Sequence, residues 1–234
     1  MKLHKICVYH GALILKSGLH IGSGDMEMHI GGTDSPVIKH PHSQEPYIPG
    51  SSLKGKTRSL LEMESGFMAI TEGKPLSPKK LGQAFDDAMR ANGEAIVKFF
   101  GAGGSEQDES GTFGPTRVSF ADCYLNEEWK KRAKDNRWPL SEVKSENTIN
   151  RVKGTAEHPR FIERVPEGTA FDFTITFKVL GEGEEILFEN LLFKGLKLVE
   201  MDAIGGSGSR GYGRVAFSFA DPAIQERFQT CNPF

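Results

Sequence analysis

Hydrophobic and polar residues alternate most regularly between Ala170 and Leu180. A period of two predicts a strand that buries one face and exposes the other. The predicted buried face consists of Phe171, Phe173, Ile175, Phe177 and Val179. Weaker forms of the pattern predict strands over Lys5–Lys16, over Tyr212–Phe219 and, in a shorter stretch, over Val118–Tyr124.

Three other stretches repeat their apolar residues with the period of an α-helix. The clearest runs from Glu184 to about Met201, with apolar positions at Phe188, Leu191, Leu192, Leu196 and Val199. A second is predicted within Pro78–Phe100, with Leu81, Phe85, Ala88, Ile96 and Phe99 facing inward.

The third predicted helix runs from Ser51 or Ser52, either of which could cap it, to about Glu64. Its buried side is predicted to hold Leu53, Leu60 and Leu61. Lys54 and Arg58 lie one turn apart and are expected to face outward.

The order of these elements is strand, helix, strands, helix, strand. This order resembles the split βαβ plan of ferredoxin-like and RNA-recognition folds, which places the chain in the α+β class. The stretch between Ser145 and Gly168 mixes charged, threonine and apolar residues and predicts either a protruding hairpin or a plain surface excursion. Because this fold supports many functions, it cannot decide one by itself.

Composition narrows the functional classes. The 234 residues carry a formal net charge of −2, which argues against binding driven by a large positive field. Three widely spaced cysteines predict reduced thiols rather than disulfides or a zinc site. No apolar run could span a membrane and the start lacks a signal sequence, so a cytoplasmic location is expected.

Charge is distributed unevenly along the chain. Between Ile38 and Leu60 the ionisable residues are Lys39, Lys54, Lys56 and Arg58 against Glu45 alone. The glycine-rich loop Gly101–Gly114 instead holds Glu106, Asp108 and Glu109 without a cation, and is given no chemistry. Any contact with a polyanion is therefore predicted to be local.

Residues Gly50–Thr57 fit the phosphate-binding pattern G-x-x-x-x-G-K-[ST]. A P-loop needs a buried strand before it, but Pro41, Pro46 and Pro49 occupy that place and remove ladder donors. The Val118–Asp122 segment offers only a loose candidate for the acidic partner strand. A P-loop NTPase is thus the weaker interpretation, and a basic helix start that faces phosphates is favoured over it.

A second glycine pattern, G-x-G-x-x-G, spans Gly206–Gly211. A dinucleotide fingerprint follows a strand and opens a helix, whereas this one follows a predicted helix and leads into a strand. It could still let a phosphodiester backbone approach closely, with Arg210 and Arg214 supplying charge, or be a loop without a ligand. The pair His40 and His42 lacks a third ligand at metal-binding spacing and is set aside.

Five motifs occur in order along almost the whole chain. They are Gly18–Gly22, Gly32–Val37 with T-D-S-P-V, Pro46–Arg58 with I-P-G-S-S-L-K-G-K, Pro159–Gly168 with E-R-V-P, and Gly205–Gly213. Together they resemble the RAMP superfamily, and specifically the RNA-cleaving backbone subunit of type III-A CRISPR effector complexes. Neither Gly101–Gly114 nor Glu127–Trp138 matches a motif of the family.

The resemblance implies a single RAMP domain over residues 1–234, with a modified RNA-recognition (ferredoxin-like) core. Insertions are expected at about 18–50, 101–114 and 141–168, the last a thumb hairpin. Copies of the chain would stack along a CRISPR RNA, with other subunits of the complex. The assembly would cut complementary target RNA with a divalent cation, Mg²⁺ or Mn²⁺.

By the same resemblance, Asp34 is the carboxylate required for cleavage. A free aspartate is a poor general base at neutral pH, so it is expected to hold the cation or to orient the attacking 2′-hydroxyl. Asp25 and Glu27 share its loop without belonging to a motif, so a two-metal site is not supported. The predicted RNA contacts are His20, Ser51, Ser52, Lys54, Lys56, Arg58, Arg160, Arg164, Gly205, Gly206, Gly208, Arg210, Gly211 and Tyr212.

The alternative from another class is a structural RNA-coating subunit in which Asp34 only forms a turn before Pro36.

Overall fold

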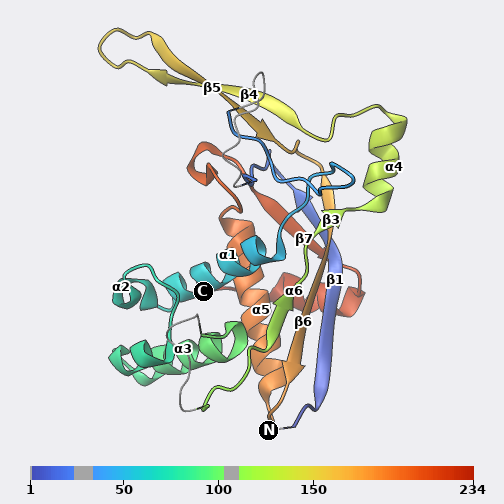
Figure 1. The fold of residues 1–234 in the computed structure, drawn as a ribbon. Helices are drawn as coiled ribbons and strands as arrows, with labels where there is room; N and C mark the ends of the chain where they lie inside the picture. Colours follow the sequence, from blue (N-terminus) through green and yellow to red (C-terminus); the bar gives the residue numbers. More distant parts are fainter. Residues whose placement is uncertain (1, 24–33, 103–110) are drawn as a thin grey trace.

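The computed structural model describes residues 2–23, 34–102 and 111–234 and shows a mixed α+β fold, as predicted (Figure 1). The strands are β1 Lys5–Leu15, β2 Val118–Phe120, β3 Tyr124–Leu125, β4 Glu142–Ile149, β5 Ala156–Arg164, β6 Ala170–Val179 and β7 Val215–Phe219. The helices are α1 Gly50–Glu64, α2 Phe67–Thr71, α3 Asp87–Phe100, α4 Glu127–Asp135, α5 Glu184–Met201 and α6 Pro222–Thr230. Two 3-10 turns, η1 Pro78–Gln83 and η3 Gly208–Arg210, complete the described elements.

The long strands form an antiparallel sheet in the order β2-β6-β1-β7, and β3 pairs with the start of β6. β1 leads through α1 and α3 to β2, yet β6 lies between them, which is the split arrangement that the element order predicts. The predicted strand Val118–Tyr124 is two strands with a break. The break arises because the backbone of Cys123 pairs with Ile48 instead, through N–O distances of 2.8 and 2.9 Å.

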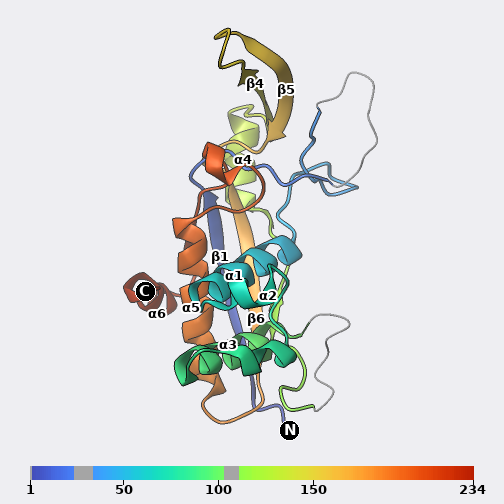
Figure 2. The same ribbon diagram turned by 90° about the vertical axis from the view of Figure 1, so that its left-hand side faces the viewer.

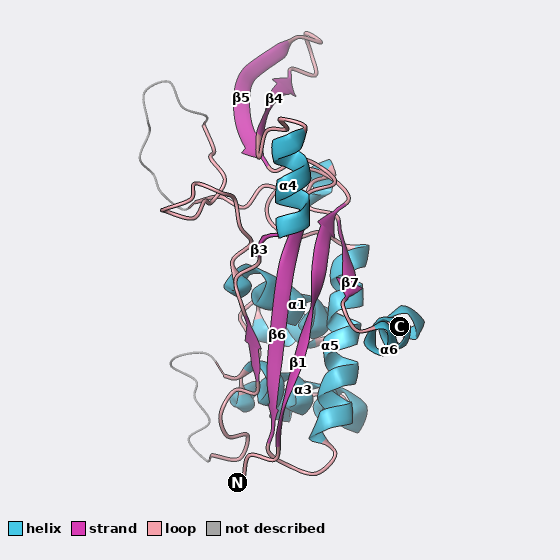
Figure 3. Ribbon diagram, turned by 90° about the vertical axis from the view of Figure 1, so that its right-hand side faces the viewer, coloured by secondary structure: helices cyan, strands magenta, loops and turns pink. Residues whose placement is uncertain are grey.

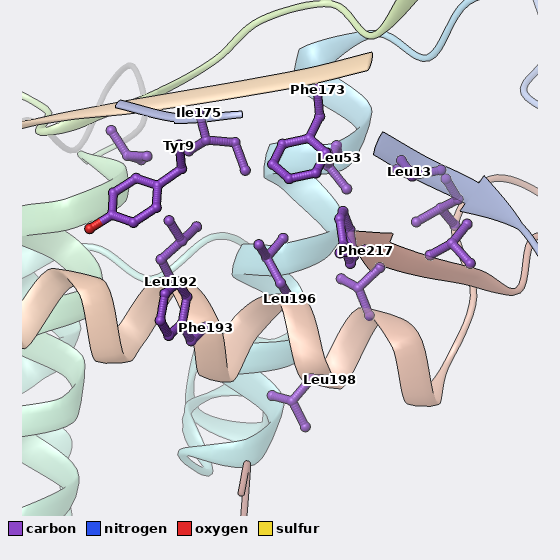
Figure 4. Packing of buried hydrophobic residues seen from close by; sticks show 14 of the residues in the cluster. Tyr9, Leu13, Leu53, Phe173, Ile175, Leu192, Phe193, Leu196, Leu198 and Phe217 are labelled. Carbon is purple, nitrogen blue, oxygen red and sulfur yellow. The ribbon is translucent and has the colours of Figure 1, made fainter. Parts of the chain in front are cut away.

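Helices α1, α3 and α5 cover one face of the sheet (Figures 1 and 2). Between the two layers lies the core, where Phe173 and Ile175 of β6 and Leu13 of β1 face Leu192 and Leu196 of α5 (Figure 4). All five are at most 1% exposed. The predicted inward faces of β6 and α5 are therefore confirmed as parts of the core, and burying a side chain of this size stabilises a fold by about 1.5–3 kcal/mol.

The two other predicted helices differ in detail. α1 begins at Gly50 with Pro49 before it, and neither Ser51 nor Ser52 caps it. The Pro78–Phe100 stretch is η1 followed by α3, because the Asp86 side chain accepts a hydrogen bond from Met89 N at 2.7 Å and starts a new helix. The new start changes the buried face, so Phe85 is 85% exposed and Ala88 is exposed as well.

A two-stranded hairpin of β4 and β5 projects from the end of the sheet (Figures 1 and 3). Both strands of this hairpin lie within the stretch 141–168 where a hairpin was expected, with β4 beginning at Glu142. Helices α2, α4 and α6 were not predicted. None of the helices in the described part of the chain combines the length and hydrophobicity that crossing a bilayer requires.

Candidate nucleic-acid interface

Three distant parts of the sequence meet at the hairpin base, defined here as residues 142–146 of β4 and 160–164 of β5. The segment after β1 pairs through Leu19 with Val165, and Ser35 forms a parallel bridge to Ile162. From the other end of the chain, Tyr212 donates from its hydroxyl to Glu146 Oε1 at 2.8 Å. The motifs Gly18–Gly22, Gly32–Val37 and Gly205–Gly213 therefore all contact the hairpin that carries the motif Pro159–Gly168.

Asp34 lies directly against this base. Its backbone N donates to Phe161 O at 3.1 Å, and its Oδ2 accepts from Phe161 N at 2.8 Å. The residue is exposed, and its Oδ1 has no hydrogen bond within the described residues. One carboxylate oxygen therefore fixes the side chain while the other is available to solvent or a ligand.

His20 is held from two sides. Its Nδ1 lies 2.7 Å from the carbonyl oxygen of Glu163, and since a carbonyl only accepts, Nδ1 carries the proton. Its own carbonyl accepts from Gly206 N at 2.8 Å. In the neutral ring Nε2 then has the free lone pair, which suits contact with a ribose hydroxyl, and in the charged ring Nε2 is a donor suited to phosphate.

The glycine loop, residues 203–213, follows α5 and leads into β7, the reverse of a dinucleotide fold, as predicted. Gly205 has φ +72°, and a Cβ there would lie 2.3 Å from His20 O, so the loop and His20 approach too closely for any side chain. Arg210 keeps half of its side chain exposed while pairing with Glu146 at 3.1 Å. The close approach shown here is to His20, and contact of the loop with a phosphate backbone stays a prediction.

Tyr212 has a different role from the predicted RNA contact. It is 0% exposed, and its ring lies between the Lys144 amine at 4.7 Å and the Arg164 guanidinium at 5.1 Å. Burial and then the hydrogen bond to Glu146 raise the pKa of its hydroxyl. Tyr212 thus joins the glycine loop to the hairpin base, and its buried side chain leaves no exposed surface for the predicted RNA contact.

The two arginines of the hairpin base differ in whether their side chains are already engaged by other residues. Arg160 is exposed. Arg164 donates from Nε to Glu142 Oε1 at 2.6 Å and lies so close to Gly18 that a Cβ on the glycine would be 2.6 Å from Arg164 Cδ. Arg160 is therefore the one placed to reach a ligand.

The start of α1 does not form a phosphate cradle. Residues 50–57 are helical throughout, Thr57 is 0% exposed, and its hydroxyl donates to Leu53 O at 2.8 Å. The N–H of Gly50 donates to the Asp122 carboxylate at 2.8 Å, so a side chain of the protein already occupies this helix N-terminus. The P-loop match is accidental, and the prediction of an anion site made by the helix tip is not supported.

The three cations of α1 are not equivalent. Lys54 has no ion pair within the described residues, and burial followed by the charge of Arg58 lowers the pKa of its amine. Lys56 pairs with Asp202 at 2.6 Å. The prediction that Arg58 faces outward is wrong, because it donates to Glu62, to Leu76 O and to Gly101 O at 2.6–2.8 Å.

The carboxylate of Glu163, which sequence reasoning missed, connects the hairpin base to residues outside it. Glu163 is 7% exposed and accepts from Val37 N at 3.0 Å, Lys39 Nζ at 2.6 Å and Ser141 Oγ at 2.6 Å. Burial pushes the pKa of this carboxyl upward, but the bonds from Lys39, Ser141 and Val37 outweigh it and lower the pKa. Glu163 stood inside the E-R-V-P motif, yet nothing in its spacing reveals a partner 126 positions away.

For a metal, Asp34 is the motif carboxylate at the hairpin base, and one of its oxygens has no hydrogen bond within the described residues. Within the described residues no group of three or more His, Cys, Asp or Glu could hold an ion. Asp25 and Glu27 lie outside the described residues. The free Oδ1 of Asp34 fits the mode in which Mg²⁺ takes one carboxylate, waters and the phosphates of a bound substrate. His40 and His42 pack edge-on 5.5 Å apart beside Tyr124.

Comparison with known proteins matches residues 13–216 to the RAMP superfamily. The endoribonuclease Csm3 of the CRISPR system Cms from Streptococcus thermophilus is 39% identical over 205 residues, covering 87% of this chain and 83% of the relative. The corresponding protein of Methanothermobacter thermautotrophicus is 37% identical over 232 residues, covering 93% and 85%.

Two solved structures share the fold. The crystal structure of Methanopyrus kandleri Csm3 aligns with a TM-score of 0.59 and 26% identity over 92% of this chain and 75% of that one. A Csm3–Csm4 subcomplex of the type III-A CRISPR-Cas interference complex aligns with a TM-score of 0.55 and 28% identity, covering 93% and 77%.

The antiparallel sheet, the projecting hairpin and the motifs gathered at its base define a protein of the RAMP superfamily. Within that superfamily, the chain belongs to the Csm3 family of CRISPR endoribonucleases.

Proposed function

We propose that this chain is an RNA-guided endoribonuclease subunit that forms the backbone of a type III-A CRISPR complex. Copies of it would stack head to tail along a CRISPR RNA, and each would cut complementary target RNA once. The observation that carries the proposal is the exposed carboxylate of Asp34, fixed against the base of a projecting hairpin by Phe161 N at 2.8 Å. The family membership supports it.

In this proposal the main sheet and helices form a modified RNA-recognition domain. The stretches 18–50, 101–114 and 141–168 are insertions into it. The strand order β2-β6-β1-β7 supports this interpretation. The hairpin of the third insertion would act as a thumb that holds one nucleotide out of the RNA stack. Partners of the chain would be CRISPR RNA, target RNA, further copies and other subunits of the complex.

Cleavage would proceed by attack of a ribose 2′-hydroxyl on the adjacent phosphate, with the 5′-oxygen leaving. The proton leaves the 2′-hydroxyl and one reaches the leaving oxygen, which yields a cyclic phosphate and a 5′-hydroxyl. Asp34 would orient the 2′-hydroxyl or hold the divalent cation through Oδ1. A bound Mg²⁺ or Mn²⁺ would supply neutralisation of phosphate charge.

RNA would be bound through cations and close backbone approach rather than by reading bases. The proposed contacts are Arg160 within the hairpin base, His20 Nε2 and Arg210 beside it, and the backbone of Gly206, Gly208 and Gly211 in the glycine loop. Lys54, together with the exposed Ser51, would extend the contact along α1, and Lys56 would join it if RNA competes with Asp202.

The alternative is a structural coating subunit, and the bond between Asp34 Oδ2 and Phe161 N is the observation that favours it. Two substitutions in the assembled complex separate the functions. Asp34→Asn keeps an oxygen to accept from Phe161 N but removes the charge, whereas Asp34→Ala removes both.

For a catalytic carboxylate, both variants lose cleavage of a matched, end-labelled RNA by about 10²-fold or more, with assembly and target binding retained. For a turn residue, Asp34→Asn cuts as well as the unchanged protein. The same assay with and without chelator tests the cation, and cleavage at full rate in chelator would remove it from the proposal.

A further inference from the structure

Helix α4 and the residues after it carry an exposed cationic surface that the proposed function leaves unused. This α4 surface comprises Lys131, Arg132, Lys134, Arg137 and Trp138. All five are exposed, and none of the four cations has an ion pair within the described part of the chain. Lys130 differs, because it bonds to Glu45 and Glu127 at 3.1 and 3.0 Å.

Favourable interaction with the helix dipole accounts for only part of this surface. Arg132 and Lys134 stand in the last turn, where cations stabilise a helix by about 0.3–1 kcal/mol. That effect explains neither Lys131 and Arg137 nor Trp138, whose indole is half exposed.

The end of α4 is held in an unfavourable conformation that displays this tryptophan. Trp138 N donates to Ala133 O at 2.8 Å, and Arg137 N to Lys134 O at 3.1 Å, a helix ending in which glycine is normally found at position 137. Arg137 instead adopts φ +56°. A non-glycine residue in this region costs about 1–2 kcal/mol, and such strain is commonly retained at functional sites.

Trp138 lines two cavities of about 400 and 550 Å³, which are in the size range of small-ligand pockets. The first is lined also by Trp129, Arg132 and Glu142, and the second by Lys131 and Lys134. Because Glu142 belongs to the hairpin base and bonds to Arg164, the first cavity borders the candidate RNA interface. Figure 3 shows α4 beside this base, on the face of the sheet opposite to α1 and α3.

We propose that the α4 surface binds single-stranded RNA, with one base stacked on Trp138 and phosphates against Lys131, Lys134 and Arg137. A half-exposed aromatic ring between a small cavity and a row of unpaired cations is the combination that binds single strands without sequence preference. The proposal rests on the proposed function in that the chain must bind RNA. It adds a second contact, beyond the hairpin base, for a stretch of the same strand or of its complement.

Intrinsic tryptophan emission can report on this site. Trp129 and Trp138 are the only two tryptophans of the chain, and Trp129 is only 4% exposed. Titrating the full chain with a 5′-labelled single-stranded RNA gives two readouts. Anisotropy of the label measures total RNA binding, and tryptophan emission measures stacking on Trp138. We expect RNA to quench emission, and Trp138→Leu to abolish the quenching and weaken binding at this site about 5- to 150-fold.

The charged part is tested with Lys131→Gln/Lys134→Gln, which keeps Trp138 as reporter. The slope of log affinity from quenching against log salt should fall by roughly 1.4, about 0.7 for each lost phosphate contact on a single strand. Lys74→Gln/Lys79→Gln is the matched control, since both residues are exposed and lie near η1, and it should leave the slope unchanged. Arg137→Gly should raise the denaturation midpoint yet weaken quenching.

Several results would overturn the inference. Anisotropy that rises without any change in emission leaves RNA binding intact but removes the α4 surface from it. Absence of both signals contradicts the proposed function itself. A polyglutamate peptide that quenches as well as RNA would assign the surface to an acidic protein partner, and emission that changes with protein concentration alone would assign it to a second copy.

Discussion

The segments of the candidate site are connected by hydrogen bonds of single residues, which the sequence motifs do not reveal. Glu163 is the clearest case, because one buried carboxylate ties Lys39, Ser141 and the backbone of Val37 to the hairpin base, while its own carbonyl accepts from His20. The segment that carries Asp34 is thus held in place by a carboxylate that is buried inside the protein. Glu163 acts on cleavage, in this view, only as a positioning residue.

This arrangement predicts a pH-dependent loss of stability in Glu163→Gln. At pH 7 the variant should lose about 2 kcal/mol, since hydrogen bonds to a charged group contribute about 1.5–3 kcal/mol. The pKa of Glu163 is lowered in the folded state, so its stabilisation is complete above the unfolded pKa near ~4.3 and is lost as pH falls through the folded value.

Denaturant midpoints of both proteins between pH 7 and pH 3 measure this difference, which should narrow as the pH falls. The exposed Glu167, changed to Gln, is the control and should show no such gap. If the difference in midpoint between the unchanged protein and Glu163→Gln stayed constant from pH 7 to pH 3, the charge of Glu163 would not be what stabilises the fold.

At the level of elements, the long periodic segments, β7 and the hairpin could be predicted, whereas the helices α2, α4 and α6 could not. β1, β6, α1 and α5 follow from hydrophobic period alone. α4 was missed because its only buried residues are Trp129 and Ala133, too few to form an apolar stripe. The orientation of Arg58 was wrong because helical spacing places it beside Lys54 but cannot show that the carbonyls of Leu76 and Gly101 come to meet it.

The site could be predicted only as far as its motifs name residues. The motifs name Asp34, His20 and the glycine loop, and the structure brings these residues to one place, while their contacts with RNA stay predictions. The roles of Tyr212 and Glu163 depend on partners more than 60 positions away, so no local pattern could reveal them. Asp122, whose carboxylate accepts from Gly50 N at the start of α1, could not be predicted either, because it lies 72 positions from Gly50 in the sequence.

The glycine loop allows a test in which two glycines differ in one respect. Gly205 and Gly211 both have positive φ, at +72° and +83°, but only at Gly205 would a Cβ meet an atom, His20 O at 2.3 Å. Gly205→Ala should therefore cost about 2 kcal/mol or more and displace His20, whereas Gly211→Ala should cost about 1 kcal/mol from φ alone.

Denaturant midpoints compare the stabilities of the two variants, and RNA affinities compare their binding. Gly205→Ala should have both the lower midpoint and the lower affinity. Equal losses in the two variants would show that the close approach of the loop to His20 has no bearing on RNA binding.

At the scale of the whole molecule, the proposed function requires a chain of net charge −2 to bind RNA, and it would do so largely through cations that are not already paired. Many of its basic side chains already have acidic partners, among them Lys39, Lys56, Arg164 and Arg210. Each copy would then supply only a few phosphate contacts, and stacked copies would supply the affinity by multivalency. The dependence of binding on salt should accordingly reveal which cations are in contact with RNA.

Lys54 and Arg58, one turn apart on α1, provide the final test. Lys54→Gln should reduce the salt slope of RNA binding by about 0.7 for each bound copy and leave the denaturation midpoint nearly unchanged, because Lys54 has no ion pair in the described structure. Arg58→Gln should do the opposite. It leaves Glu62, whose side chain is 6% exposed, without its partner, and losing one member of a buried pair costs about 3–5 kcal/mol.

The double variant Arg58→Met/Glu62→Leu should restore part of that stability, because it leaves no buried charge unpaired, although Leu76 N, Leu76 O and Gly101 O lose these partners. It should bind RNA with an unchanged salt slope. A slope that falls in this double variant would place Arg58 on the RNA surface after all. A slope that stays constant in Lys54→Gln would move the RNA path away from α1, leaving the hairpin base and the glycine loop as the part of the molecule along which copies could align on one strand.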